Sequence, residues 1–237
     1  NKRGDMIGKV YLCLRFPGIR HKSEKLHPRK KGYGGACFDD SCGSSSSSNS
    51  CSSTSSTCSS RSKDSSRCLP KRFVYWNNAL AHLAVDYAAF QIGNHDVVKH
   101  YGEWLEIWDE YTMKPGKPTD EIVGRHQHEY DLWKASRRPQ ILYCQLRFFF
   151  CEQLGKALPI LAIHYSNVRI QVRLRELRDC YYSSDCSTPY LIDCDQELSP
   201  RDIKVTAYAN VYFLSEDERD DINDDEHEYL IVQCQYN

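Results

Sequence analysis

The chain has 237 residues, of which 41% are hydrophobic and 12% aromatic, so it is long enough to bury the core of one large β domain. Its 31 basic and 32 acidic side chains give a formal net charge of −1, so there is no general electrostatic reason to expect nucleic acid as a partner. No apolar run reaches the roughly 18 residues of a membrane helix and no secretory signal begins the chain, so direct membrane insertion is not expected.

The first predicted element is a strand over residues 7–16. Apolar side chains alternate there from Val10 to Phe16, and a Pro-Gly pair ends the run. Alternation with period two is typical of a strand that buries one face. Residues 19–69 follow and are first basic, then rich in serine and cysteine. Because this composition cannot bury enough apolar surface to offset its ordering entropy, we expect a flexible insertion within the domain.

Order returns near residue 73, and the next elements are a short helical turn over residues 78–83 and two strands that meet at a Gly-Asn turn, residues 84–92 and 96–100. Apolar side chains then recur at helical spacing from Trp104 to Tyr111, which predicts a short amphipathic helix. Residues 113–138 hold several Pro and Gly and little periodicity, so we expect a long surface loop.

Long strands dominate the rest of the chain. An apolar and aromatic run covers residues 141–151, and strict alternation follows over residues 168–175 and again over 203–213. A capping box at Ser215 predicts a helix through residue 222, and residues 228–235 read as a last strand. This order predicts an all-β, antiparallel jelly-roll sandwich with short helical insertions. The large apolar residues expected in its core are Trp104, Trp108, Phe148, Phe150 and Ile163.

None of the 12 cysteines shows the C-x-x-C spacing of zinc or redox motifs. We expect buried free thiols at Cys13, Cys144, Cys151 and Cys234. A local disulfide among Cys180, Cys186 and Cys194 stays open, because sequence alone cannot assign partners.

Few residues suggest chemistry. His126 and His128 would project from the same side of a strand, as metal ligands do, but the Glu and Gly that follow such a pair in cupins are not correctly spaced here. The remaining histidines are dispersed, and neither a Gly-x-Ser-x-Gly elbow nor a nucleotide-binding glycine motif occurs. We therefore predict no catalytic, cofactor-binding or metal-binding residues, no cofactor, and no enzymatic activity.

Four blocks of sequence carry a resemblance to a known family. They are Arg3-Gly4-Asp5 through Leu12, Lys99 through Trp108, Ala157 through Tyr165, and Asp217-Glu218-Arg219 together with His227 through Ile231. In this order they resemble the N-terminal jelly roll of the major capsid proteins of nucleocytoplasmic large DNA viruses.

The resemblance implies a structural protein that self-assembles into an icosahedral shell. Family members carry two jelly rolls in tandem, form trimers with a pseudo-hexagonal outline, and surround an internal membrane. Residues 1–237 would then be a single jelly-roll domain, the first half of a double jelly-roll protein. The family's opening strand precedes the Gly-Asp motif, so the sandwich is expected to be incomplete. Implied partners are two further copies, neighbouring capsomers and minor capsid proteins, in a virion assembled in the host cytoplasm.

Two alternatives stay open at this stage. In place of a fragment of a double jelly-roll protein, the chain could be a divergent paralogue with one jelly roll, such as a minor capsid component. Jelly rolls also serve as lectins, and the loops over residues 114–138 or 180–200 would then bind host glycans.

Overall fold

The structure is a computed structural model that describes residues 4–24, 69–113, 119–163 and 165–233. These residues form one compact unit, built from the chain before residue 25 and the chain after residue 68. The predicted insertion over residues 19–69 lies almost entirely outside the described residues, so its flexibility stays a prediction.

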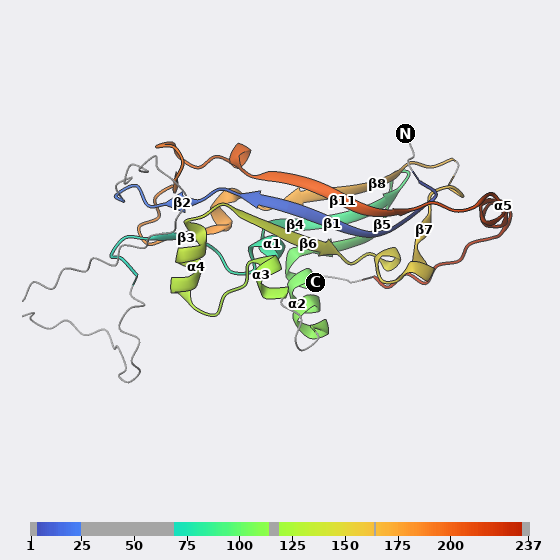
Figure 1. The fold of residues 1–237 in the computed structure, drawn as a ribbon, viewed down its shortest axis with the longest axis horizontal. Helices are drawn as coiled ribbons and strands as arrows, with labels where there is room; N and C mark the ends of the chain where they lie inside the picture. The colour runs from blue at the N-terminus through green and yellow to red at the C-terminus, as the bar shows by residue number, and fades with distance from the viewer. Residues whose placement is uncertain (1–3, 25–68, 114–118, 164, 234–237) are drawn as a thin grey trace, which may run out of the picture. The chain divides into compact units, whose positions relative to one another are not determined.

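The first sheet is organised around β1 (Met6–Phe16). This strand pairs antiparallel with β11 (Lys204–Tyr212) on one edge and with β6 (Gln140–Leu146) on the other, and its start also pairs with β7 (Leu158–Pro159). Figure 1 shows β1 running between its two long neighbours. The predicted strand at residues 7–16 is confirmed, and its alternation has the expected effect, because Val10, Leu12, Leu14 and Phe16 are all buried.

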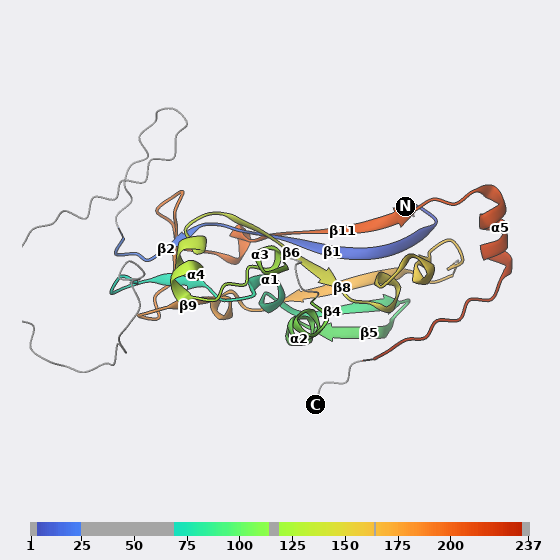
Figure 2. The same ribbon diagram turned by 60° about the horizontal axis from the view of Figure 1, so that its bottom comes forward.

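The second sheet has β4 (Val85–Ile92) at its centre, between β5 (His95–Tyr101) and β8 (Val168–Leu174). Gly93 makes the tight turn from β4 to β5 with a φ of 64°, a conformation that glycine adopts without strain. Figure 2 shows the two sheets as separate layers. Both the hairpin and the alternating strand near residue 168 are confirmed.

Two small antiparallel pairs lie near one end of the layers. They are β2 (Ile19–Arg20) with β10 (Tyr190–Leu191), and β3 (Val74–Trp76) with β9 (Tyr181–Ser183). Trp76 anchors this end, because its ring packs on Phe16 at 5.1 Å between centroids and its indole N–H donates to the carbonyl of Pro17 at 3.1 Å.

Aromatic side chains join the two sheets. The ring of Phe90 in β4 lies 5.7 Å from that of Phe148 and 4.9 Å from that of Phe150, both of which follow β6. All three side chains are fully buried. Phe148 and Phe150 are therefore core residues as predicted, whereas Trp104 and Ile163 are only partly buried against the core, and Trp108 is 39% exposed. The prediction for Trp108 was wrong because helical spacing identifies an apolar stripe but not how much of it the sheets cover.

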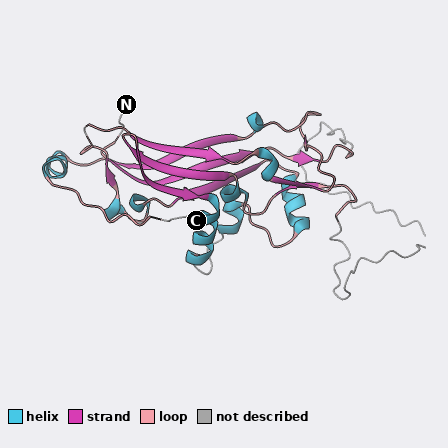
Figure 3. Ribbon diagram, turned by 180° about the vertical axis from the view of Figure 1, so that it is seen from behind, coloured by secondary structure: helices cyan, strands magenta, loops and turns pink. Residues whose placement is uncertain are grey.

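Helices lie at the ends and on one side of the strands (Figure 3). They are α1 (Leu80–Leu83), α2 (Gly102–Thr112), α3 (Thr119–Val123), α4 (Glu129–Ser136) and α5 (Glu216–Asp224), with single 3-10 turns at η1 (Phe149–Cys151), η2 (Leu154–Lys156), η3 (Leu177–Asp179) and η4 (Pro200–Asp202). The helices predicted after residues 78, 104 and 215 are confirmed, the last with the capping box formed by Ser215 and Glu218. In the described part of the chain, no helix is both long and apolar enough to span a bilayer.

The prediction of one long loop over residues 113–138 was wrong. Apart from residues 114–118, which lie outside the described residues, most of this segment forms α3 and α4. Each helix is too short for its periodicity to stand out, and each is held by tertiary contacts: Val123 and Leu132 are buried, and the hydroxyl of Ser136 accepts a hydrogen bond from the backbone N–H of Trp76 at 2.8 Å.

The predicted last strand was also wrong over its described part, because residues 228–233 form no strand. The tyrosine hydroxyl of Tyr229 instead donates to the carbonyl of Ala157 at 2.9 Å, and the amide of Gln233 donates to the carbonyl of Val97 at 3.0 Å. The segment therefore crosses other elements without pairing along a sheet edge. The run over residues 141–151 likewise holds a shorter strand than predicted, since β6 ends at Leu146 and η1 follows.

Cys13, Cys144 and Cys151 are free and buried, as predicted, whereas Cys234 lies outside the described residues. Cys180, Cys186 and Cys194 are also free, so this structure has no disulfide among them. Burial raises the pKa of the Cys144 thiol to about 12, so it stays protonated and behaves as a small apolar group.

We expect Phe148→Ala to lower the free energy of unfolding by about 3–5 kcal/mol, because it removes a fully buried ring and leaves a cavity between the sheets. Trp108→Ala, at a position that is 39% exposed, should cost clearly less. Urea unfolding of both variants measures the difference. Equal losses would contradict the assignment of Phe148, rather than Trp108, to the core.

Candidate functional site

The two histidines considered as metal ligands do not lie on a strand. His126 precedes α4, and its backbone N–H donates to the side chain of Asn78 at 2.7 Å; His128 occupies the N-cap position of that helix, where its side chain makes no capping hydrogen bond. Within the described residues, no group of three or more His, Cys, Asp or Glu side chains has an arrangement that would hold a metal ion. The strand geometry on which that hypothesis depended is thus contradicted.

Three of the four sequence blocks that carry the resemblance, the first, third and fourth, meet in space at one end of the first sheet. One carboxylate oxygen of Asp5 accepts hydrogen bonds from the backbone N–H of Leu214 at 2.8 Å and from two nitrogens of Arg219 at 2.9 and 3.1 Å. The carbonyl of Asp5 accepts from the backbone N–H of Leu161 at 3.1 Å. Asp5 therefore fastens the start of β1 to the end of β11, to α5, and to the segment after β7.

Gly4 makes this contact possible. Its φ is 101°, and a Cβ atom placed on it would lie 1.8 Å from a methyl carbon of Val211, which no side chain tolerates. Glycine is thus required for the backbone to approach β11 closely enough for the next residue to reach Leu214. Gly4 and Asp5 together hold the start of β1 against the end of β11.

The pKa of the Asp5 carboxyl is lowered, chiefly by the hydrogen bond from the Leu214 N–H, while burial opposes the shift and Arg219 reinforces it. A carboxyl group with a lowered pKa stabilises the folded state above its ordinary pKa and loses that contribution as the pH falls through its folded pKa.

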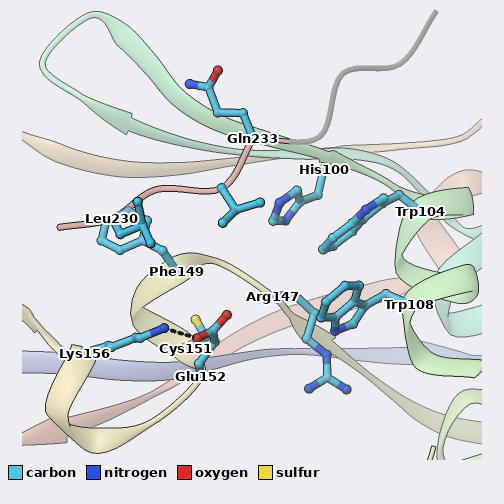
Figure 4. A pocket seen from close by; sticks show the side chains of 11 residues that line it. His100, Trp104, Trp108, Arg147, Phe149, Cys151, Glu152, Lys156, Leu230 and Gln233 are labelled. Carbon is cyan, nitrogen blue, oxygen red and sulfur yellow. Dashed lines mark hydrogen bonds and ion pairs between the residues drawn. The ribbon is translucent and has the colours of Figure 1, made fainter. Parts of the chain in front are cut away.

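A second feature is an aromatic pocket of about 370 Å³ between β5, α2, the turn after β6 and the C-terminal segment, residues 228–233. Its lining residues are His100, Trp104, Trp108, Arg147, Phe149, Cys151, Glu152, Lys156, Leu230, Val232 and Gln233. Figure 4 shows His100 and Trp104 on one side, with Phe149 and Leu230 opposite and the ion pair between Glu152 and Lys156 at the far end. We call this feature the aromatic pocket below.

Stacked rings form one wall of the aromatic pocket. The imidazole of His100 stacks on the indole of Trp104 at 4.0 Å between centroids, and Trp104 stacks on Trp108 at 5.5 Å. His100 is 3% exposed, and its Nδ1 atom has no hydrogen-bond partner in the described structure. Desolvation lowers the pKa of His100 to about 4, so the ring is neutral at physiological pH.

A third feature is the outer edge of β11, which has no neighbouring strand among the described residues. Val205, Ala207 and Ala209 pair with Leu14, Leu12 and Val10 of β1, so they share the face that β1 buries in the core. All three are nevertheless exposed, and Val205 is 38% accessible. The alternation predicted a strand here correctly, but it did not predict that the inner face would be uncovered.

The outer edge of β8 is also unpaired within the described chain, and β8 lies along the same side of the sandwich as β11 in Figure 1. Its inward residues Val168, Ile170 and Val172 are only partly buried. The two sheets are therefore open on the side where β11 and β8 lie, an arrangement that accepts further strands or a partner surface.

Comparisons with known proteins agree with these observations. A family model described as the N-terminus of major capsid proteins matches residues 49–215. Capsid protein 1 of Acanthamoeba polyphaga mimivirus is 29% identical over 177 residues, which cover 68% of this chain and 28% of that protein. The major capsid protein of Pyramimonas orientalis virus is 27% identical over 158 residues, which cover 65% of this chain and 36% of that protein.

The fold also resembles solved structures. VP54 of PBCV-1, in a crystal structure fitted into a reconstruction of the virophage Sputnik, aligns with 98% of this chain at a TM-score of 0.56 and 16% identity. The quasi-atomic model of the PBCV-1 virus capsid aligns over the same share at a TM-score of 0.55. In both, the aligned part is 41% of the longer chain, so this chain spans well under half of the proteins it resembles.

We expect Asp5→Asn to lower the melting temperature near neutral pH, because the amide keeps the shape of the carboxylate but loses its charge toward Arg219 and Leu214. Since the pKa of Asp5 is lowered, the difference from the parent should shrink as the pH falls through the folded pKa. Asp217→Asn, on the exposed first turn of α5, is the matched control. A difference between parent and Asp5→Asn that is the same at every pH would contradict an electrostatic role.

Burial of His100 should make the folded state less stable at acid pH. Its folded pKa of about 4 lies below its ordinary value of 6.5, so the unfolded chain takes up the proton first and stability is lost as the pH falls from about 6.5 towards 4. In the parent, this site should lower the free energy of unfolding by on the order of 3 kcal/mol over that pH range. His100→Phe has no titrating group at this position and should lack this part of the loss. Urea unfolding across this pH range checks it, with surface His95→Phe as control. Parallel pH profiles for parent and His100→Phe would refute the burial effect.

Proposed function

The chain belongs to the major capsid protein family of nucleocytoplasmic large DNA viruses, whose N-terminal part it matches, and from this premise we propose that it is a structural building block of a viral capsid. Its work is self-assembly, without catalysis. The observation that carries the proposal is the uncovered inner face of β11 at the side of an otherwise rigid jelly-roll sandwich.

An open strand edge is a general means of association. It presents backbone N–H and C=O groups that another strand satisfies, and here it presents apolar side chains in the same place. A strand added beyond β8 in the facing sheet would cover Val205, Ala207 and Ala209 and extend the core between the two sheets. This supports the expectation that residues 1–237 form an incomplete jelly roll, which further strands at the β11 and β8 edges complete, within the first half of a double jelly-roll protein.

The partners follow from the same family. We place the chain in homotrimeric capsomers that contact neighbouring capsomers and minor capsid proteins, in a virion shell assembled in the host cytoplasm. A part of the surface available for such contacts is α2, where Ile107 and Tyr111 are exposed. Nucleic acid is not a proposed partner.

The glycan-binding alternative gains little from the structure. It depended partly on a long loop over residues 114–138, and the described part of that segment is mostly helix. The proposal of a capsid role therefore stands ahead of the lectin and of a metalloenzyme.

The test introduces charge on the inner face of β11. Val205→Lys should leave the fold of the isolated chain intact, because the side chain is exposed there, but it should abolish particle or capsomer formation by the longest available form of the protein. Light scattering and electron microscopy report assembly, and circular dichroism reports folding. Thr206→Lys, on the opposite face of the same strand, is the matched control. Normal assembly by Val205→Lys would exclude this edge, and monomers of the parent at every salt and protein concentration would count against the capsid role itself.

A further inference from the structure

The aromatic pocket has an apolar interior and balanced charges at its boundary. Glu152 and Lys156 form an ion pair with each other, and Arg147 is directed to Asp109 at 3.4 Å. The thiol of Cys151 donates to the carbonyl of Gly8, and burial raises its pKa to about 11, so it is not a thiolate. A charged ligand would thus meet no unpaired opposite charge among these residues, which favours a neutral molecule.

His100 is the polar group that remains unsatisfied in this wall. Its ring is held between Trp104 and Phe148, at 4.0 and 5.6 Å between centroids, so it cannot turn away to find another partner. A buried polar atom without a hydrogen bond costs on the order of 1–3 kcal/mol, and a ligand hydroxyl that reached the ring would recover part of this.

The opposite wall leaves apolar surface exposed to water. Leu230 is 87% exposed although it borders the pocket, and its segment is fastened on either side by the hydrogen bonds of Tyr229 and Gln233 to the carbonyls of Ala157 and Val97. A guest in the pocket would remove apolar surface of Leu230 and Val232 from water, which stabilises the bound state.

We propose that the aromatic pocket binds a small neutral molecule with an apolar, ring-sized body and one hydroxyl group, and that this hydroxyl hydrogen-bonds to the imidazole of His100. The indole edges of Trp104 and Trp108, with Phe149 and Leu230, enclose the apolar body. The site is independent of the β11 edge and of the assembly role proposed above.

The test uses benzyl alcohol and toluene. Benzyl alcohol carries a hydroxyl group in place of one hydrogen atom of the toluene methyl group. The full 237-residue chain is titrated with each probe at neutral pH, and binding is followed by NMR of the tryptophan indole N–H groups. Signals of Trp104 and Trp108 should shift, while that of Trp76, buried in the core outside this pocket, should not. Benzyl alcohol should bind about tenfold more tightly than toluene, as expected for one hydrogen bond to a buried group.

Two variants separate the hydrogen bond to His100 from the apolar contact with Leu230. His100→Phe keeps a stacking ring and should lose the preference, so that both probes bind with similar affinity. Leu230→Asp, at an exposed position and so without effect on folding, should weaken both probes several-fold and leave their ratio unchanged. The proposal is overturned if neither probe shifts Trp104 or Trp108, if His100→Phe retains the parent's preference, or if Leu230→Asp binds both probes as the parent does. If His100→Phe does not fold, Leu230→Asp and the parent's probe ratio still decide it.

Discussion

Strand β1 must be paired along both edges and buried on one face, and most of the structure follows from this requirement. Its inner side chains, from Val10 to Phe16, lie fully inside the core, so β6 and β11 must flank it and the second sheet must cover it. The aromatic cluster of Phe90, Phe148 and Phe150 then fixes the second sheet over the first. Among the described strands that flank β1, only β11 continues this buried face into exposed residues.

The four blocks that carry the family resemblance are distant in sequence but are linked by contacts in the folded chain. Asp5 of the first block binds Arg219 of the last and the backbone of Leu161 in the third. Trp104 of the second block shares the aromatic pocket with Leu230 of the last. A substitution in one block therefore disturbs another that is distant along the chain, which is a physical reason for such blocks to occur together.

The same arrangement separates rigid parts from parts available to partners. Interlocked aromatic rings and paired strands fill the middle of the sandwich, where a shell protein needs stiffness. The β11 edge, the exposed face of α2 and the aromatic pocket lie at its periphery. The capsid role proposed above would use both properties, since contacts at the periphery can form without repacking the core.

Period-two alternation and turn residues were enough to predict the strands near residues 7, 84, 96, 168 and 203, because alternation reports directly on a strand with two unlike faces. Spacing and capping predicted α2 and α5 for a similar local reason. The helices α3 and α4 were missed, and a last strand was wrongly expected, because short elements are decided by what they pack against. The aromatic pocket had no local signal at all, since its walls come from β5, α2, η1 and the C-terminal segment.

The sequence by itself thus determined the all-β class, the main strands and the resemblance to capsid proteins, each of which depends on patterns within a few neighbouring residues. Tertiary structure alone decided which faces are covered. It buried Phe148 and left Trp108 half open, it brought Asp5 to Arg219, and it left Val205 exposed beside a buried Leu14. The reason is that the burial of a residue depends on its neighbours in space, and these neighbours come from distant parts of the chain.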